Sequence, residues 1–238
     1  DVLPGPPGSA WVSLSELNQV VRLDLSRGVV ERLVLPGADG TNGSAGSVRA
    51  LARTGDGSLW MTFGRRGLAR WRGRGELEVL PPGGALDVPD GDTYDLAVDA
   101  EGTLWVGSTG GGLSWLCAGC ARFEHRVEVP GDARSLPGRD VSTVLPAADG
   151  SVWVGTRHRG AARLLADRSG FERYPPQPDQ PGGLGHPFVT SLYEDAAGVL
   201  WMGTQGGGVH RVVRDAAGRA TAFEQFDRAR GLAAEAIG

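Results

Sequence analysis

The chain has 238 residues, of which 40% are hydrophobic and 22% are charged, as is typical of a soluble globular protein. Its formal net charge of −4 excludes the basic surface that nucleic-acid-binding proteins need. No apolar run approaches the roughly 18 residues that cross a membrane, so we expect no membrane contact by this segment.

A pattern that ends in tryptophan recurs along the chain. The stretches GDGSLW, AEGTLW, ADGSVW and AAGVLW and a degenerate copy, PPGSAW, end at Trp60, Trp105, Trp153, Trp201 and Trp11. Successive tryptophans are 49, 45, 48 and 48 residues apart. Repeats of roughly 40–50 residues that are rich in short strands indicate a β-propeller or a related array. We therefore predict an all-β fold, a single propeller domain over residues 1–238 with units at 1–47, 48–93, 94–140, 141–188 and 189–238.

Each unit predicts a blade of four short antiparallel strands separated by turns that are rich in glycine and aspartate. In chain order the expected strands are 2–3, 10–14, 20–25 and 30–35; 48–53, 58–63 and 77–80; 94–99, 103–108 and 122–127; 141–147, 151–156 and 171–174; and 189–194, 199–204, 208–213 and 221–226.

The second strand of each unit is apolar on both faces. Leu104 and Val106 point to one side and Trp105 to the other, which is typical of a strand inside a stack of sheets. We therefore expect all five tryptophans in the core between blades. Gly107, Gly155 and Gly203 follow the tryptophans by two residues, and we expect them to make room for a neighbouring blade.

The repeat count leaves two arrangements open. The five units form either a closed five-bladed ring or part of a larger propeller. Val189 precedes Trp201 by twelve residues, and if the chain ends were joined Ile237 would precede Trp11 by the same number. The tail 232–238 is therefore expected to complete the first blade if the ring closes, since closure leaves no exposed sheet edge.

The only two cysteines, Cys117 and Cys120, form one Cys-Ala-Gly-Cys unit. A structural zinc site needs four ligands, and no second pair is present, so we expect no metal and no cofactor. The spacing predicts a local pair at a hairpin turn, as a disulfide in an oxidising compartment or as free thiols.

The full repeat, V-x-x-L-x-x-D-x-x-G-x-L-W-x-G-T-x-x-G-G-x-x-R, resembles the two-component regulator propeller repeat of bacterial periplasmic sensors. The best copy runs from Val189 to Arg211, and the copies at 94–115 and 141–163 are nearly as good. The resemblance implies the extracytoplasmic, ligand-sensing and non-catalytic part of a two-component signalling protein. It also implies a periplasmic location and a homodimer formed through the parent sensor.

The first copy is different. Ser13 and Thr62 replace the second-strand glycine in the first two copies, and residues 11–36 resemble the blades of virginiamycin B lyase. This resemblance implies an alternative function as a propeller lyase. A platform for binding other proteins is a third alternative.

A ligand site is expected where the copies differ, in the turns between second and third strands and in the linkers before first strands. Arginine forks suit carboxylates and phosphates, and aromatic rings stack on sugars. The expected residues for a small-molecule or oligosaccharide ligand, with anionic groups as one alternative, are Arg65, Arg66, Tyr94, Arg157, His158, Arg159, His186 and Phe188. The alternative for these residues is an ordinary solvated turn or strand-end packing. No catalytic Ser-His-Asp pattern is visible in the sequence.

Overall fold

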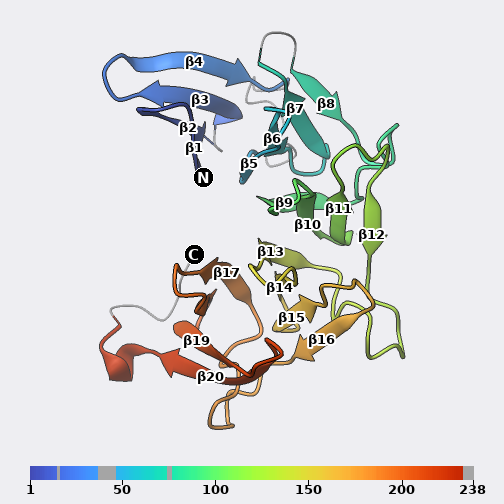
Figure 1. Ribbon diagram of the computed structural model, residues 1–238, viewed down its shortest axis with the longest axis vertical. Helices are drawn as coiled ribbons and strands as arrows, with labels where there is room; N and C mark the ends of the chain where they lie inside the picture. The colour runs from blue at the N-terminus through green and yellow to red at the C-terminus, as the bar shows by residue number, and fades with distance from the viewer. Residues whose placement is uncertain (15–16, 37–46, 74–76, 233–238) are drawn as a thin grey trace. The chain divides into compact units, whose positions relative to one another are not determined.

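The computed structural model describes residues 1–14, 17–36, 47–73 and 77–232. These residues form five four-stranded sheets, and in each sheet the strands follow one another in chain order (Figure 1). Paired strands within the sheets run antiparallel to each other. The predicted all-β class of repeated four-stranded sheets is therefore confirmed. Among these residues, no helix is both long and apolar enough to span a membrane.

The strands of each sheet are as follows. Sheet 1 holds β1 (Val2–Pro4), β2 (Ser9–Leu14), β3 (Gln19–Asp24) and β4 (Gly28–Val34). Sheet 2 holds β5 (Leu51–Arg53), β6 (Leu59–Thr62), β7 (Leu68–Trp71) and β8 (Glu78–Leu80). Sheet 3 holds β9 (Asp92–Val98), β10 (Leu104–Thr109), β11 (Gly112–Leu116) and β12 (Glu124–Arg126). Sheet 4 holds β13 (Val141–Pro146), β14 (Val152–Thr156), β15 (Ala161–Leu164) and β16 (Phe171–Tyr174). Sheet 5 holds β17 (Val189–Glu194), β18 (Leu200–Thr204), β19 (Val209–Arg214) and β20 (Ala220–Phe226), after which comes the short 3-10 helix η2 (Arg228–Arg230).

The largest difference from the predicted strands lies in sheet 2, where β5 begins three residues later than expected. Here the Thr62 hydroxyl accepts hydrogen bonds from the backbone N–H groups of Arg49 (2.8 Å) and Ala50 (3.0 Å). The side chain that replaces the repeat's glycine therefore takes the place of ladder hydrogen bonds. In sheet 1 the N-terminal residues supply β1, and the predicted contribution of the tail falls on residues 233–238, which lie outside the described residues.

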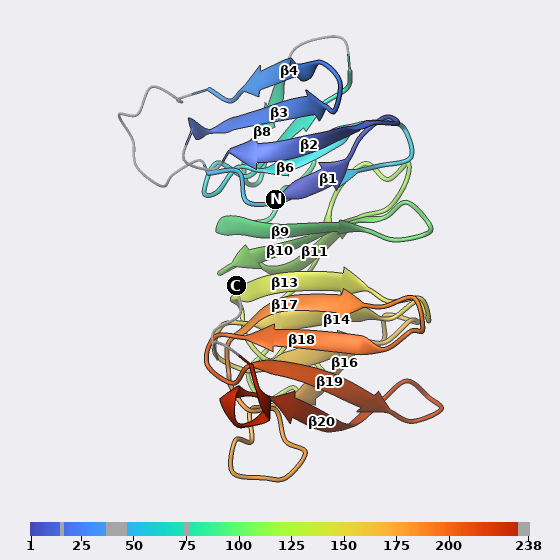
Figure 2. The same ribbon diagram turned by 90° about the vertical axis from the view of Figure 1, so that its left-hand side faces the viewer.

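The chain divides into two compact units, each of which is larger than a single repeat. Unit 1 comprises residues 1–110 and 114–125, and unit 2 comprises residues 111–113 and 126–238. Within unit 1 the first strands β1, β5 and β9 contact one another in order, and within unit 2 β13 lies beside β17 (Figure 2). In each unit the sheets therefore stack with their first strands together, as propeller blades do.

The repeated tryptophans fill the space between stacked sheets. Trp11 packs with apolar residues of sheet 2, Trp60 with those of sheet 3, and Trp153 with those of sheet 5. Together with Trp105, these side chains are at most 3% exposed. Trp201 differs from the expectation because it is only half-buried. Sheet 5 is the last sheet of unit 2, so no later sheet of that unit covers its tryptophan face.

In four of the sheets, a tryptophan, an arginine and a glutamate lie opposite one another on three successive strands and form a row across the sheet. In sheet 4, Trp153 lies opposite Arg163 on the next strand, and Arg163 lies opposite Glu172. The arginine and glutamate form an ion pair of 3.2 Å. Matching rows run through sheets 1, 2 and 5: Trp11–Arg22–Glu31, Trp60–Arg70–Glu78 and Trp201–Arg211–Glu224. In these four sheets the arginine at the end of the sequence repeat therefore anchors the outer strands.

Two kinds of repeat glycine have clear packing reasons. A Cβ on Gly155 would lie 2.6 Å from Thr143 Cγ2 and 2.8 Å from Val189 of the neighbouring sheet, which confirms the expected close approach. Gly208 has a left-handed φ of 72°, and a Cβ there would collide with the Phe226 carbonyl oxygen of the adjacent strand. Gly208 therefore belongs to a hairpin turn, as expected of the glycine-rich turns of the repeat.

Candidate functional site

In unit 2, the turn between β14 and β15 meets the linker that precedes β17. The guanidinium carbon of Arg157 lies 5.4 Å from the ring centroid of Phe188, a cation–π distance. The backbone joins the same two segments, because Gly160 N–H donates to the Pro187 carbonyl at 2.9 Å. The structure thus brings two of the predicted residues, from neighbouring sheets, into one cluster.

The histidines of this cluster are held in different ways. His158 Nε2 is 3.9 Å from Asp140 Oδ2, and the His158 side chain is 73% exposed. His186 Nδ1 accepts a hydrogen bond from Phe188 N–H at 3.1 Å. A neutral His186 therefore carries its proton on Nε2, where it can donate to a ligand. Sequence reasoning did not predict Asp140 as a site residue. The one feature of the sequence that could have indicated it is its position at the end of the linker before β13.

Arg159 makes contacts with other residues. Its backbone N–H donates to Thr156 Oγ1 at 3.0 Å, and its side-chain stem lies over Gly138 in the linker before β13. Arg159 is exposed, as expected of an ordinary turn residue. Within unit 2, the site therefore comprises Arg157, His158, His186, Phe188 and Asp140.

In unit 1, the predicted residues fall into two separate places. Arg66 donates to the Pro36 carbonyl at 2.8 Å and lies over the Phe63 ring at 5.5 Å, so it ties its own turn to the segment after β4. Arg65 in the same turn is exposed. The contacts of Arg66 favour the structural interpretation of that residue.

The half-buried Tyr94 forms the second place in unit 1. The guanidinium carbon of Arg49 lies 4.6 Å from the centre of the Tyr94 ring, and Arg49 pairs with Asp92 at 3.1 Å. Sequence reasoning missed Arg49. A signal was available, because Arg49 precedes Trp60 by the same number of residues as Tyr94 precedes Trp105.

A serine, a histidine and an aspartate do come together in unit 1, although the sequence shows no such pattern. Ser114 Oγ lies 2.8 Å from His125 Nδ1, and His125 Nε2 lies 3.7 Å from Asp87 Oδ2. Ser114 is fully buried, so a substrate cannot reach its hydroxyl. We therefore interpret this trio as a structural tie between β11, β12 and the linker before β9.

The remaining histidine, His210 on β19, is also structural. It is fully buried, and its Nε2 accepts a hydrogen bond from Gly185 N–H at 3.0 Å. Burial lowers the pKa of His210 to about 4, so the imidazole is neutral near pH 7. Among the described residues, no group of three or more histidine, cysteine, aspartate or glutamate side chains is arranged to hold a metal ion.

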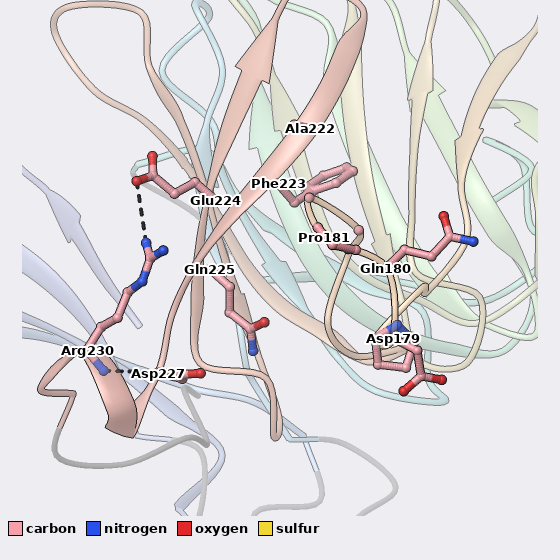
Figure 3. Close-up of a pocket in the computed structure, with 12 residues that line it drawn as sticks. Asp179, Gln180, Pro181, Ala222, Phe223, Glu224, Gln225, Asp227 and Arg230 are labelled. Atoms are coloured by element: carbon pink, nitrogen blue, oxygen red, sulfur yellow. Dashed lines mark hydrogen bonds and ion pairs between the residues drawn. The ribbon is translucent and has the colours of Figure 1, made fainter.

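A hollow of about 600 Å³ lies beside β20 and the linker before β17 (Figure 3). Phe223 forms one wall, and Glu224 pairs with Arg230 at 3.5 Å near its mouth. None of the eight predicted ligand residues lines this hollow.

In sheet 3, Cys117 and Cys120 are joined in a disulfide across the hairpin after β11, with Cα atoms 5.2 Å apart.

Three repeats of the chain, at residues 87–110, 135–158 and 183–206, match the family described as Two component regulator propeller. The resemblance expected from the sequence motifs is confirmed for these repeats. No curated protein sequence matches the chain.

Solved structures share the fold at low sequence identity. A streptogramin B lyase superposes with a TM-score of 0.69 and 16% identity over 95% of this chain and 67% of its own. A catalytically inactive virginiamycin B lyase from Staphylococcus aureus, with quinupristin, gives a TM-score of 0.67 and 17% identity over 94% and 68%. The extracellular domain of a putative hybrid two component system from B. thetaiotaomicron gives 0.63 and 18% over 75% of this chain and 24% of that one. These matches confirm the propeller fold, and the chain spans about a quarter of the last structure.

Proposed function

We propose that this chain, three of whose repeats are two-component regulator propeller repeats, is the ligand-binding part of a signalling protein. The proposal places it outside the cytoplasm, in the periplasm, as a single non-catalytic propeller domain. Its ligand is a small molecule or oligosaccharide with a carboxylate or another anionic group. Dimerisation would occur through the parent sensor.

The observation that carries the ligand class is the Arg157–Phe188 pair in unit 2. A guanidinium presents its donors in a planar fork that matches a carboxylate in a bidentate way. Stacking on the Phe188 ring fixes the plane of that fork. The exposed His158 follows Arg157 in the same turn, and His186 precedes Phe188 in the same linker, so the two segments offer two further donors. An arginine on an aromatic face, flanked by histidines, suits an acidic sugar.

Calorimetry with the full chain tests this proposal. The probe is an oligogalacturonate tetramer, and maltotetraose is the neutral control. Arg157→Ala should weaken binding about tenfold, since a charge-assisted hydrogen-bond pair is lost. Arg157→Lys should lose most of the same affinity because it keeps the charge without the fork. Arg159→Ala, at the exposed residue two positions later, is the matched control and should bind as the parent does.

Two results would contradict the proposal. One is equal affinity of the Arg157→Ala chain and the parent for the acidic tetramer. The other is equal affinity of the parent for the acidic and the neutral tetramer.

The alternative function is a lyase, and one observation favours it. His158 and Asp140 form a histidine–carboxylate pair 3.9 Å apart on an exposed surface, within the distance expected of a general base and its partner. The test is loss of quinupristin over time in the presence of the chain. The lyase alternative requires turnover that His158→Ala abolishes, and it fails if the parent leaves quinupristin intact.

A further inference from the structure

A second pocket lies in unit 1, between sheets 2 and 3, at the ends of the strands that carry the first hairpin turns. Its volume is about 440 Å³. Sheet 2 contributes Trp60, Arg70 and the turn that holds Asp56, whereas sheet 3 contributes the turn at Glu101 and the disulfide hairpin 117–120. None of the residues in the proposed ligand site lines this pocket.

The corresponding space between sheets 4 and 5 is filled by an arginine side chain. There, Arg219 from the last hairpin of sheet 5 donates to Glu172 of sheet 4 at 2.9 Å. Glu172 also accepts from Arg163 at 3.2 Å and from the Tyr174 hydroxyl at 2.9 Å. Gly218 of the same hairpin abuts Arg163 and Asp149. A guanidinium from the neighbouring sheet thus covers the tryptophan–arginine–glutamate row.

The pocket between sheets 2 and 3 is open because the equivalent hairpin is short. In sheet 5, β19 and β20 continue beyond the paired residues Val212 and Phe223 to Arg214 and Ala220 before the chain turns, whereas in sheet 3 β11 already ends at Leu116 and β12 begins only at Glu124. The disulfide between Cys117 and Cys120 closes its tip, where Ala118 and Gly119 have no side chain long enough to reach sheet 2. Arg122, the long side chain of this hairpin, does not line the pocket. The place that Arg219 occupies in unit 2 is therefore empty in unit 1.

The charges around this pocket favour a cation. Arg70, which lines it, is neutralised by Glu78 at 2.7 Å and lies over the Trp60 ring at 4.9 Å. Asp56 accepts hydrogen bonds from Thr54 and Ser58, which hold the pKa of Asp56 below its usual value and keep it ionised. In the described part of the chain no ion pair is made by Asp56 or Glu101, so the walls carry two negative charges.

We propose that this pocket binds a guanidinium group on an aliphatic stem, as in an arginine side chain presented by a peptide. The guanidinium lies between Asp56 and Glu101, and the stem packs on Leu104, Leu116 and the disulfide. The planar group pairs with carboxylates through several hydrogen bonds. This inference is independent of the acidic-sugar site in unit 2, and either can hold without the other.

The test is NMR titration of the oxidised full chain with N-acetyl-arginine methylamide. The matched probe is N-acetyl-citrulline methylamide, which has nearly the same shape but no charge. The arginine compound should shift the amide signals of Gly102, Ala118 and Gly119. The citrulline compound should bind about tenfold more weakly, since a hydrogen-bonded charge is lost.

Variants separate the pocket from general electrostatics. Asp56→Asn combined with Glu101→Gln should weaken arginine binding about tenfold. Asp24→Asn, at a turn aspartate of sheet 1 with the same serine hydrogen bonds, should leave it unchanged. Ala118→Arg should abolish binding by placing an arginine inside the pocket. Equal binding of citrulline, signal shifts confined to other residues, or no binding of the arginine compound would each overturn the proposal.

Discussion

The indole of Trp153 lacks the hydrogen bond that the matching indole of sheet 2 makes. There, Trp60 Nε1 donates to Thr54 Oγ1 at 3.1 Å. In sheet 4, Ala147 stands at the position of Thr54, and Trp153 Nε1 is buried with no partner among the described residues. In sheets 3 and 5 the acceptor is an aspartate at the same position, in the pairs Trp105–Asp99 and Trp201–Asp195.

We therefore predict that Ala147→Thr stabilises the protein. The new hydroxyl should accept the Trp153 N–H and donate to Asp149, as Thr54 donates to Asp56 at 2.6 Å. A buried donor without a partner costs roughly 1–3 kcal/mol, and a neutral hydrogen bond contributes about 1 kcal/mol net. Ala147 is 8% exposed, so added bulk carries its own cost. Ala147→Val carries the same bulk without the acceptor and is the matched control.

Urea unfolding followed by tryptophan fluorescence measures the difference. Ala147→Thr should exceed Ala147→Val by about 1 kcal/mol in the free energy of unfolding, with unchanged slope. For a chain of this size the midpoint of thermal unfolding should differ by roughly 2–4 °C. Equal stability of the two variants would refute the reasoning, because the hydroxyl would then have found no donor.

Three further outcomes follow from buried groups. Burial lowers the pKa of His210 to about 4, so between pH 6.5 and pH 4 the unfolded chain binds a proton that the folded chain does not. Up to about 3 kcal/mol of the stability present above pH 6.5 should therefore be lost as the pH falls to 4. The His210→Gln variant should lose less over the same pH range. Gly155→Ala should cost about 1–3 kcal/mol in urea unfolding through crowding, and a neutral effect would show that β17 can shift. Glu172→Gln changes a carboxylate that is only 17% exposed and should destabilise the protein by about 3 kcal/mol. Glu78→Gln changes one that is 46% exposed and should cost under about 1 kcal/mol. Equal losses of stability in calorimetry would contradict this ranking.

The candidate site was only partly predictable. Arg157 and Phe188 were both expected in a ligand site, but nothing in the sequence indicates that they stack. Arg66 was expected in a ligand site, but nothing in the sequence indicates that it donates to the Pro36 carbonyl. Side-chain direction at a turn depends on contacts from other segments, and such contacts have no periodic signal in a sequence.

The sequence by itself determined the repeat, the strands and their order. Apolar alternation and turn glycines act locally, so each copy predicts its own sheet, and β17 has the predicted bounds Val189–Glu194. Only the tertiary structure decided which charged and aromatic groups meet. Arg163, 9 residues away, reaches Glu172 across paired strands of one sheet, and Arg219, 47 residues away, reaches it because two sheets stack. Stacking also decides which spaces between sheets are filled. The last hairpin of sheet 5 covers the tryptophan–arginine–glutamate row of sheet 4, whereas the disulfide-closed hairpin of sheet 3 leaves a pocket beside sheet 2.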